Sequence, residues 1–466
     1  MSSDPIQIAS PNETAALTPP TGGERNFAGW LILAILFAVL IAGELGASFT
    51  NATQAKMDEF DSQLKLIVQE EQSEAKPSLG SPGPKEELSK LESQFASQKK
   101  LDDLGNELYA AVLTEEKKPV PVSVYQPLLS SKSDSAKSIG RIYAPGKLSL
   151  DDARSLQKRL SGEKDFVVRL AIVQALEKAG DRTARAKMLP KPSPILEGIA
   201  TLGLMGLMGA SVFVWFGYFA ARSSGDLRPA GLRNGALTLP QADQFAIRAA
   251  QLFCGWIVIG LLCLELFGKA RVDQPPALFA QGFAMLAFVP LLFRIPLGQT
   301  RLSLADLGLT RENLGRNVLW GLAGFAAEIP VAVVLSLLMM ALFRFLPTPQ
   351  HPAEEELRQT TSPVTIAAIL FVGTVVAAFW EEILFRGLLF PALSRLCKSI
   401  PLGALISSIV FASIHPQGAA VWPSLCVVGL MSCALSYQTR SLVPSIVMHF
   451  CHNAVLLALT VQTSSG

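Results

Sequence analysis

The feature that most constrains this chain is a series of long apolar runs. A helix needs about 20 apolar residues to cross the ~30 Å hydrocarbon core of a bilayer. The first such run covers residues 27–49, and further runs begin near Ile195, Ala246, Pro276, Asn317, Pro363, Leu402, Ala419 and Leu442. Helices satisfy their own backbone hydrogen bonds in lipid. The sequence therefore predicts an all-α polytopic membrane protein with about nine transmembrane helices and the lipid bilayer as its partner.

Composition supports this class and excludes others. The chain is 50% hydrophobic and only 17% charged, which is apolar for a soluble protein. The formal net charge is +2, which gives no basis for a nucleic-acid partner. The cysteines lie in or beside the apolar runs and show no zinc-type spacing.

The apolar and polar stretches divide the chain into five parts. We expect a disordered tail over 1–26, a transmembrane anchor over 27–49 and a small helical extramembrane domain over 50–193. Membrane helices then follow over 194–362, and a C-terminal membrane core over 363–461. In the extramembrane domain, Ser149 is expected to cap one helix at its N-terminus and Gly180 to end another.

Basic residues in the short loops predict the orientation. The side that holds the N-terminus collects Arg25, Arg222, Arg228, Arg233, Arg294, Arg301, Arg311, Arg316, Arg395, Lys398 and Arg440. The other side collects only Lys269, Arg271, Arg344 and Arg358. We therefore expect the N-terminus in the cytoplasm, with 50–193 and the C-terminus outside it. The absence of eukaryotic sorting signals favours a bacterial inner membrane.

The stretch FWEEILFRG places ionisable side chains near the end of an apolar run. Each such group costs several kcal/mol in lipid, on scales from ~3 to ~10. Glu382 and Arg386 are four residues apart, so on a helix they share a face and can pair. Glu381 points about 100° away. One carboxylate is thus neutralised locally, and the other is left for a different task.

Two histidines and an asparagine follow on later apolar runs. His449 and Asn453 are four residues apart and project from one side of the last run, and Pro416 ends a helix just after His415. Any one of these groups can serve packing alone. The whole set within one short region instead indicates a functional cavity, because ionisable groups in spans usually face one.

These residues form an ordered set of motifs. EEILFR matches EExxxR, FASIH matches FxxxH, and HFCHN matches HxxxN. In this order they resemble the CAAX-protease and bacteriocin-processing family (CPBP, or Abi), which includes type II CAAX prenyl endopeptidases and lysostaphin-resistance-like proteins. The resemblance covers roughly 363–461, which would then be the catalytic core.

The resemblance implies an intramembrane endopeptidase that acts on membrane-associated or lipidated proteins. In such an enzyme Glu381 would activate water with His415, and Glu382 and Arg386 would be a supporting pair. A carboxylate in a poorly solvated site becomes a competent base near neutral pH. The substrate partner would be a membrane-associated protein or peptide.

The remaining motif residues imply the oxyanion site and raise the zinc alternative. His449 and Asn453 match the residues that stabilise the oxyanion, a large term in acyl transfer. A zinc-dependent protease would instead use Glu381, His415 and His449 as ligands. No HExxH is present. We favour a mechanism without a cofactor because Asn453 suits an oxyanion better than a metal.

A second alternative is a non-catalytic membrane protein, with an immunity or regulatory role or a transport function. Glu265 and Glu328 lie in spans without a partner in the sequence pattern, and we expect both to face water or lie at helix ends. His452 lies at an unspecified position within HFCHN and would be a substitute donor or a packing residue. The chain shows no internal repeat of the transporter type, and three intact motifs favour the enzyme.

Overall fold

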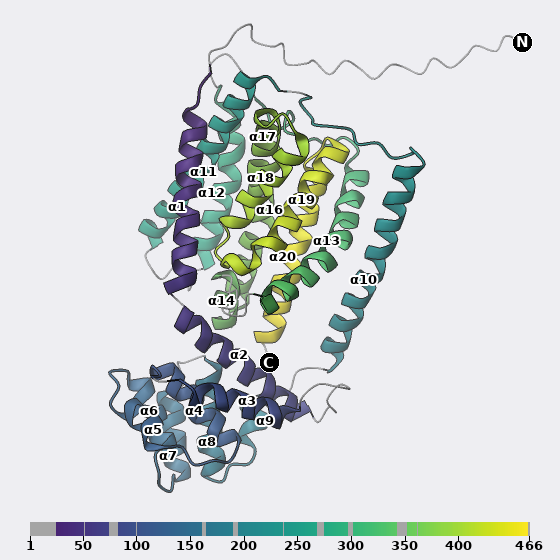
Figure 1. The fold of residues 1–466 in the computed structure, drawn as a ribbon. Coiled ribbons are helices and arrows are strands. Elements are labelled where there is room, and N and C mark those ends of the chain that lie inside the picture. The colour runs from purple at the N-terminus through teal and green to yellow at the C-terminus, as the bar shows by residue number, and fades with distance from the viewer. Residues whose placement is uncertain are drawn as a thin grey trace, which may run out of the picture.

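The computed structural model describes residues 25–50, 52–73, 83–98, 100–160, 165–189, 194–235, 237–267, 275–296, 302–342, 352–360 and 362–464. Within these ranges the regular structure is helical, without strands, and eight helices are long and apolar enough to cross a membrane. Figure 1 shows them as one bundle, with a group of short helices at one end. The prediction of an all-α polytopic membrane protein with a small helical domain is confirmed.

The eight candidate spans account for most of the predicted apolar runs. Seven of them lie in α1 (Ala28–Thr50), α10 (Pro194–Ser223), α11 (Leu239–Phe267), α12 (Pro275–Arg294), α13 (Leu314–Leu342), α19 (Trp422–Thr439) and α20 (Val443–Ser464). The remaining span, which is sixth in chain order, is Pro363–Leu396, a continuous run of 34 residues. It consists of α15 (Pro363–Leu370), η2 (Phe371–Val376), α16 (Ala377–Glu382), η3 (Ile383–Leu389) and α17 (Phe390–Leu396). The short helix α14 (Pro352–Gln359) precedes it.

The predicted span that begins near Leu402 corresponds to a shorter helix, α18 (Ile400–Ser413). Its 14 residues rise only about 21 Å at ~1.5 Å per residue, less than the ~30 Å of the hydrocarbon core. A turn and the short helix η4 (Ala419–Val421) then lead into α19. His415 is therefore in a turn, where its position is set by the elements around it.

The long span Pro363–Leu396 has a local irregularity beside the EExxxR motif. Segments η2 and η3 are π-helical, and α16 between them ends at Glu382. π-Helical turns within α-helices are rare and often occur at functional sites, because the wider turn redirects side chains. The apolar pattern of the sequence gives no sign of them.

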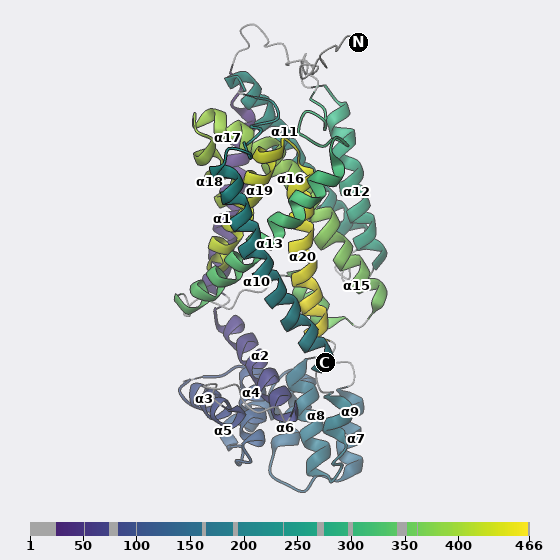
Figure 2. The same cartoon turned by 90° about the vertical axis from the view of Figure 1, so that its right-hand side faces the viewer.

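Loops from distant parts of the chain meet at one end of the bundle. Arg25 pairs with Asp243 at 2.7 Å, the Gly231 amide donates to the Tyr437 carbonyl, and the Leu442 amide donates to the Gly308 carbonyl. The group of short helices and the C-terminus lie at the opposite end (Figures 1 and 2). The loops that the span count places on the side of the N-terminus therefore lie together at one end of the bundle. Which end is cytoplasmic stays a prediction, and residues 1–24 of the predicted tail lie outside the described ranges.

The short helices have a core of their own. They are α2 (Ala52–Ser73), α3 (Pro84–Ala96), α4 (Asp103–Glu115), α5 (Val122–Leu129), α6 (Asp134–Tyr143), α7 (Leu150–Arg159), α8 (Phe166–Lys178) and α9 (Ala184–Met188). Ser149 and Asp152 form a capping box at α7, as predicted. Gly180 has φ +101° just beyond α8, a conformation that glycine adopts without strain.

Close helix contacts fix the motif-bearing helices to one another. A Cβ on Gly403 would lie 2.4 Å from the Ser394 hydroxyl, and one on Gly429 would lie 2.7 Å from the Ser408 Cβ. Small residues let helix backbones approach closely where lipid supplies no hydrophobic drive for association. The chain from α17 through α19 is therefore tightly packed, which holds the turn containing His415 in place.

Candidate active site

The site includes an ion pair within the span Pro363–Leu396. The Arg386 Nη1 atom lies 2.9 Å from Glu382 Oε1, and neither side chain has exposed surface. The pairing expected from the four-residue spacing is therefore present. The Arg386 guanidinium also lies over the Phe411 ring, 4.4 Å from its centroid. Its charge is thus balanced by one carboxylate and one aromatic face.

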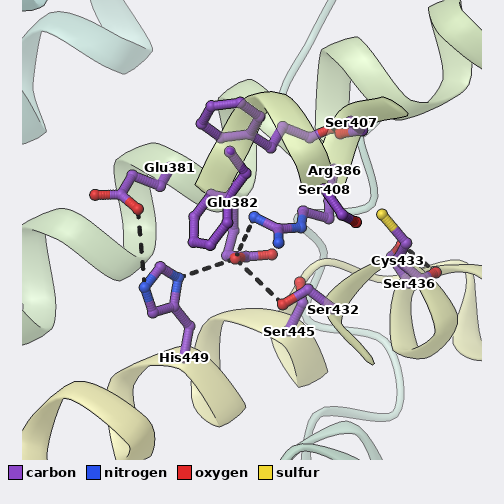
Figure 3. Close-up of polar contacts among 12 residues, drawn as sticks. Glu381, Glu382, Arg386, Ser407, Ser408, Ser432, Cys433, Ser436, Ser445 and His449 are labelled. Carbon is purple, nitrogen blue, oxygen red and sulfur yellow. Dashed lines mark hydrogen bonds and ion pairs between the residues drawn. The ribbon is translucent and has the colours of Figure 1, made fainter. Parts of the chain in front are cut away.

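His449 of α20 lies between the two motif carboxylates. Its Nδ1 atom is 3.0 Å from Glu382 Oε1, and its Nε2 atom is 3.8 Å from Glu381 Oε2 (Figure 3). An ionised carboxylate only accepts hydrogen bonds, so Nδ1 carries the hydrogen. The Glu382 contact therefore directs Nε2 towards Glu381.

His415 approaches Glu381 from the turn after α18. Its Nδ1 atom lies 2.6 Å from the Phe411 carbonyl oxygen, and its Nε2 atom lies 3.7 Å from Glu381 Oε2. A carbonyl oxygen also only accepts, so Nδ1 is again the donor and Nε2 again faces Glu381. Glu381, His415 and His449 thus converge, as expected from the sequence. In their neutral form both rings present an acceptor atom to a carboxylate.

The site has a fully buried side and a partly exposed side. The side chains of Glu382 and Arg386 are fully buried, and that of His449 is 3% exposed. Those of Glu381 and His415 are 20% and 15% exposed. Glu381 and His415 therefore form the more exposed side of the site. The ion pair and His449 support them from behind.

Asn453 contacts a different neighbour. Its Nδ2 atom donates to the Gly373 carbonyl oxygen at 2.8 Å, which joins α20 to η2. This bond lies on the same side of α20 as His449, as the four-residue spacing predicts. It engages the side-chain amide with the backbone rather than with the carboxylates. The predicted oxyanion role of Asn453 stays a prediction.

Sequence patterns missed several residues around the buried carboxylate. The Ser432 hydroxyl donates to Glu382 Oε1 at 3.4 Å, and Ser445 lies against the same carboxylate (Figure 3). Phe411 contributes more than the spacing to His415, because its ring also lies 5.7 Å from the His449 ring. Serines are common on membrane helices, so no sequence signal distinguishes Ser432 and Ser445.

Glu328 corrects an expectation. It was expected to face water or lie at a helix end, but its side chain has no exposed surface and it lies near the middle of α13. Its Oε2 atom is 3.1 Å from His452 Nδ1 on α20. Glu265 is exposed near the end of α11, as expected. His351 lies outside the described ranges.

The donor set was also tested for a metal. Among the residues that the structure describes, no group of three or more His, Cys, Asp or Glu side chains is arranged to hold an ion. Glu381, His415 and His449 face one another, with both Nε2 atoms directed towards Glu381 Oε2. Whether the site works with or without zinc stays a prediction.

The fold and site define a polytopic membrane protein with a buried acid–base cluster of glutamate and histidine. Residues 363–455 match the sequence model of a protein family described as type II CAAX prenyl endopeptidase Rce1-like. All three motifs lie within the matched segment, which confirms the resemblance to CAAX proteases. The match supports a protease of the CAAX endopeptidase type. Neither the curated proteins nor the solved structures gave a significant match to the chain.

Proposed function

We propose that this protein is an intramembrane endopeptidase that hydrolyses peptide bonds of membrane-associated or lipidated proteins with a water molecule activated by Glu381 and His415. The observation that carries the proposal is the convergence of the Nε2 atoms of His415 and His449 on Glu381 Oε2, at 3.7 and 3.8 Å. Three acceptor atoms that face one another need a hydrogen-bond donor or a cation among them, and we propose the donor. The two O–H groups of a water molecule supply it, as does a proton held by one of the rings.

The proposed reaction uses the partly exposed side of the site. Glu381 takes a proton from the water molecule while the water oxygen bonds to the scissile carbonyl carbon. The carbon–nitrogen bond then breaks, and the proton passes from Glu381 to the leaving nitrogen, which yields a carboxyl group and an amine. His415 holds the water and the transferring proton in line. No covalent enzyme intermediate is needed.

The buried side is proposed to stabilise the developing charge. His449 donates from Nδ1 to Glu382, whose charge is balanced by Arg386. A proton on His449 Nε2 would face the developing oxyanion, and preorganised donors of this kind are commonly a large part of catalysis. Asn453 is proposed as a further oxyanion donor once the substrate is bound. The Asn453 Nδ2 atom carries two hydrogens, and the bond to the Gly373 carbonyl uses one of them.

A cleavage assay tests the function. The purified protein in lipid nanodiscs receives a fluorescence-quenched peptide that carries a lipid anchor, and a matched peptide without the lipid is the substrate control. We expect cleavage by the wild type and by Glu265→Gln, whose carboxylate is exposed near the end of α11. Glu381→Gln should be inactive, because an amide is not a base at neutral pH. Full activity of folded Glu381→Gln would overturn the proposal.

Two alternatives are separated by the same assay. A zinc-dependent protease would lose activity with chelators and regain it with added zinc, whereas the proposed mechanism is insensitive to both. A non-catalytic regulatory protein or a transporter would show no cleavage by the wild type on any lipidated peptide. The ordered motifs within the matched segment favour the protease.

A further inference from the structure

A second buried carboxylate–histidine pair occupies none of the specified motif positions. Glu328 Oε2 on α13 is 3.1 Å from His452 Nδ1 on α20, and the two side chains are 0% and 8% exposed. Glu328 is near the middle of α13, a helix of 29 residues. Such a pair is often no more stabilising than apolar residues of the same size. Its presence beside the site therefore calls for a role other than stability.

The two helices are in close contact one heptad earlier. A Cβ on Gly321 of α13 would lie 2.6 Å from the Val447 Cβ and 2.7 Å from the Pro444 carbonyl oxygen of α20. Glu328 follows Gly321 by seven residues, and His452 follows Pro444 by eight. The helices thus run in the same direction and stay in register over about two turns.

Three polar contacts anchor this part of α20 to three different elements. His449 binds Glu382 of α16, His452 binds Glu328 of α13, and Asn453 binds the Gly373 carbonyl of η2. At 100° per residue, His452 lies about 60° from His449 around the helix, and Asn453 about 40° to the other side. Contacts on both sides of His449 resist rotation of α20 in either direction.

We propose that Glu328 and His452 are positioning residues for the hydrolysis, and that their hydrogen bond sets the rotation of α20 that aims His449 at Glu381. This inference rests on the proposed function. The His449 ring lies about 5–6 Å from the helix axis, so a 10° rotation moves it by about 1 Å. A misplacement of this size can lower a rate by about 10²-fold.

The key variant removes the hydrogen bond without leaving a buried polar group unpaired. In the double variant Glu328→Met/His452→Leu both positions are apolar, so the fold should be retained. We expect kcat to fall about 10- to 100-fold with KM within about threefold of the wild type. Glu328→Gln keeps an acceptor for His452 and should retain most of kcat. Glu265→Met, an exposed position on α11, is the matched control.

A spectroscopic measurement reports on His449 without the need for activity. The chain has four histidines, so selective ring labelling gives at most four sets of NMR signals. We expect the double variant to shift the His449 ring signals and Glu328→Gln to leave them near their wild-type positions. If the wild type cleaves nothing, the proposed function fails, and these shifts still decide the positioning.

The outcomes are distinct. Full kcat and unchanged His449 signals in the folded double variant would overturn the proposal and leave the pair a purely structural role. If the double variant does not fold, Glu328→Asp and Glu328→Gln provide the test. Aspartate keeps the charge but shortens the side chain, so it should lose kcat where glutamine keeps it. The reverse order would show that the charge of Glu328, rather than its hydrogen bond, matters.

Discussion

The buried ion pair makes Glu382→Gln the most informative single substitution. The change leaves the Arg386 guanidinium without its carboxylate at a site with no exposed side-chain surface. Loss of one partner of a buried pair typically costs about 3–5 kcal/mol. That corresponds to about a 10²- to 10⁴-fold fall in the folding equilibrium constant. At about 2 °C per kcal/mol, we expect the melting midpoint in detergent to fall by about 6–10 °C.

The neighbouring carboxylate provides the control. Glu381 has no ion pair closer than 3.7 Å. Glu381→Gln should therefore melt within about 2 °C of the wild type and yet be inactive. The double variant Glu382→Met/Arg386→Met removes both charges and should recover most of the lost midpoint. Melting is followed by tryptophan fluorescence together with the yield of solubilised protein. An unchanged midpoint for Glu382→Gln would refute the uncompensated-charge argument.

Three further predictions concern the same site and the topology. His415→Ala should be about as inactive as Glu381→Gln. The double variant should be little worse than either single variant, because the losses from groups that act as a unit are not additive. Additive losses in kcat would contradict a shared water. Asn453→Ala should lower kcat about 10²- to 10³-fold if it serves the oxyanion, and unchanged kcat in folded protein would limit it to holding η2. Reporter fusions after Gly105 and after Arg228 should give opposite compartment signals, and identical signals would contradict the span count.

The parts of the site that the sequence predicted are those with a local or an energetic reason. Glu382 and Arg386 pair because a four-residue spacing places them on one helical face. The meeting of Glu381 with His415 and His449 followed from the cost of leaving each alone in lipid. That cost does not depend on the order in which the helices pack. The lengths of the apolar runs separately gave the span count to within one short helix.

The parts that were missed depend on packing across the bundle. The π-helical turns beside Glu381 and the short length of α18 leave the apolar pattern unchanged. Ser432 reaches Glu382 because α19 packs closely on α18, where Gly429 leaves room for Ser408. A serine on an apolar helix is compatible with many neighbours. Only the packed bundle determines which one it contacts.

Glu328 shows how far the cost argument can be extended. The same free-energy penalty that indicated a partner for Glu381 applies to any carboxylate in the middle of a span. It therefore requires a partner for Glu328 as well, and His452 is 124 residues away in the chain. The penalty states that a partner exists but not which residue it is. Among the described residues, His452 is the one buried histidine that fills no specified motif position. Within the same described ranges, Glu328 is the one carboxylate in the middle of a span that belongs to no motif. Pairing the unassigned acid with the unassigned base would have joined α13 to α20 from the sequence alone.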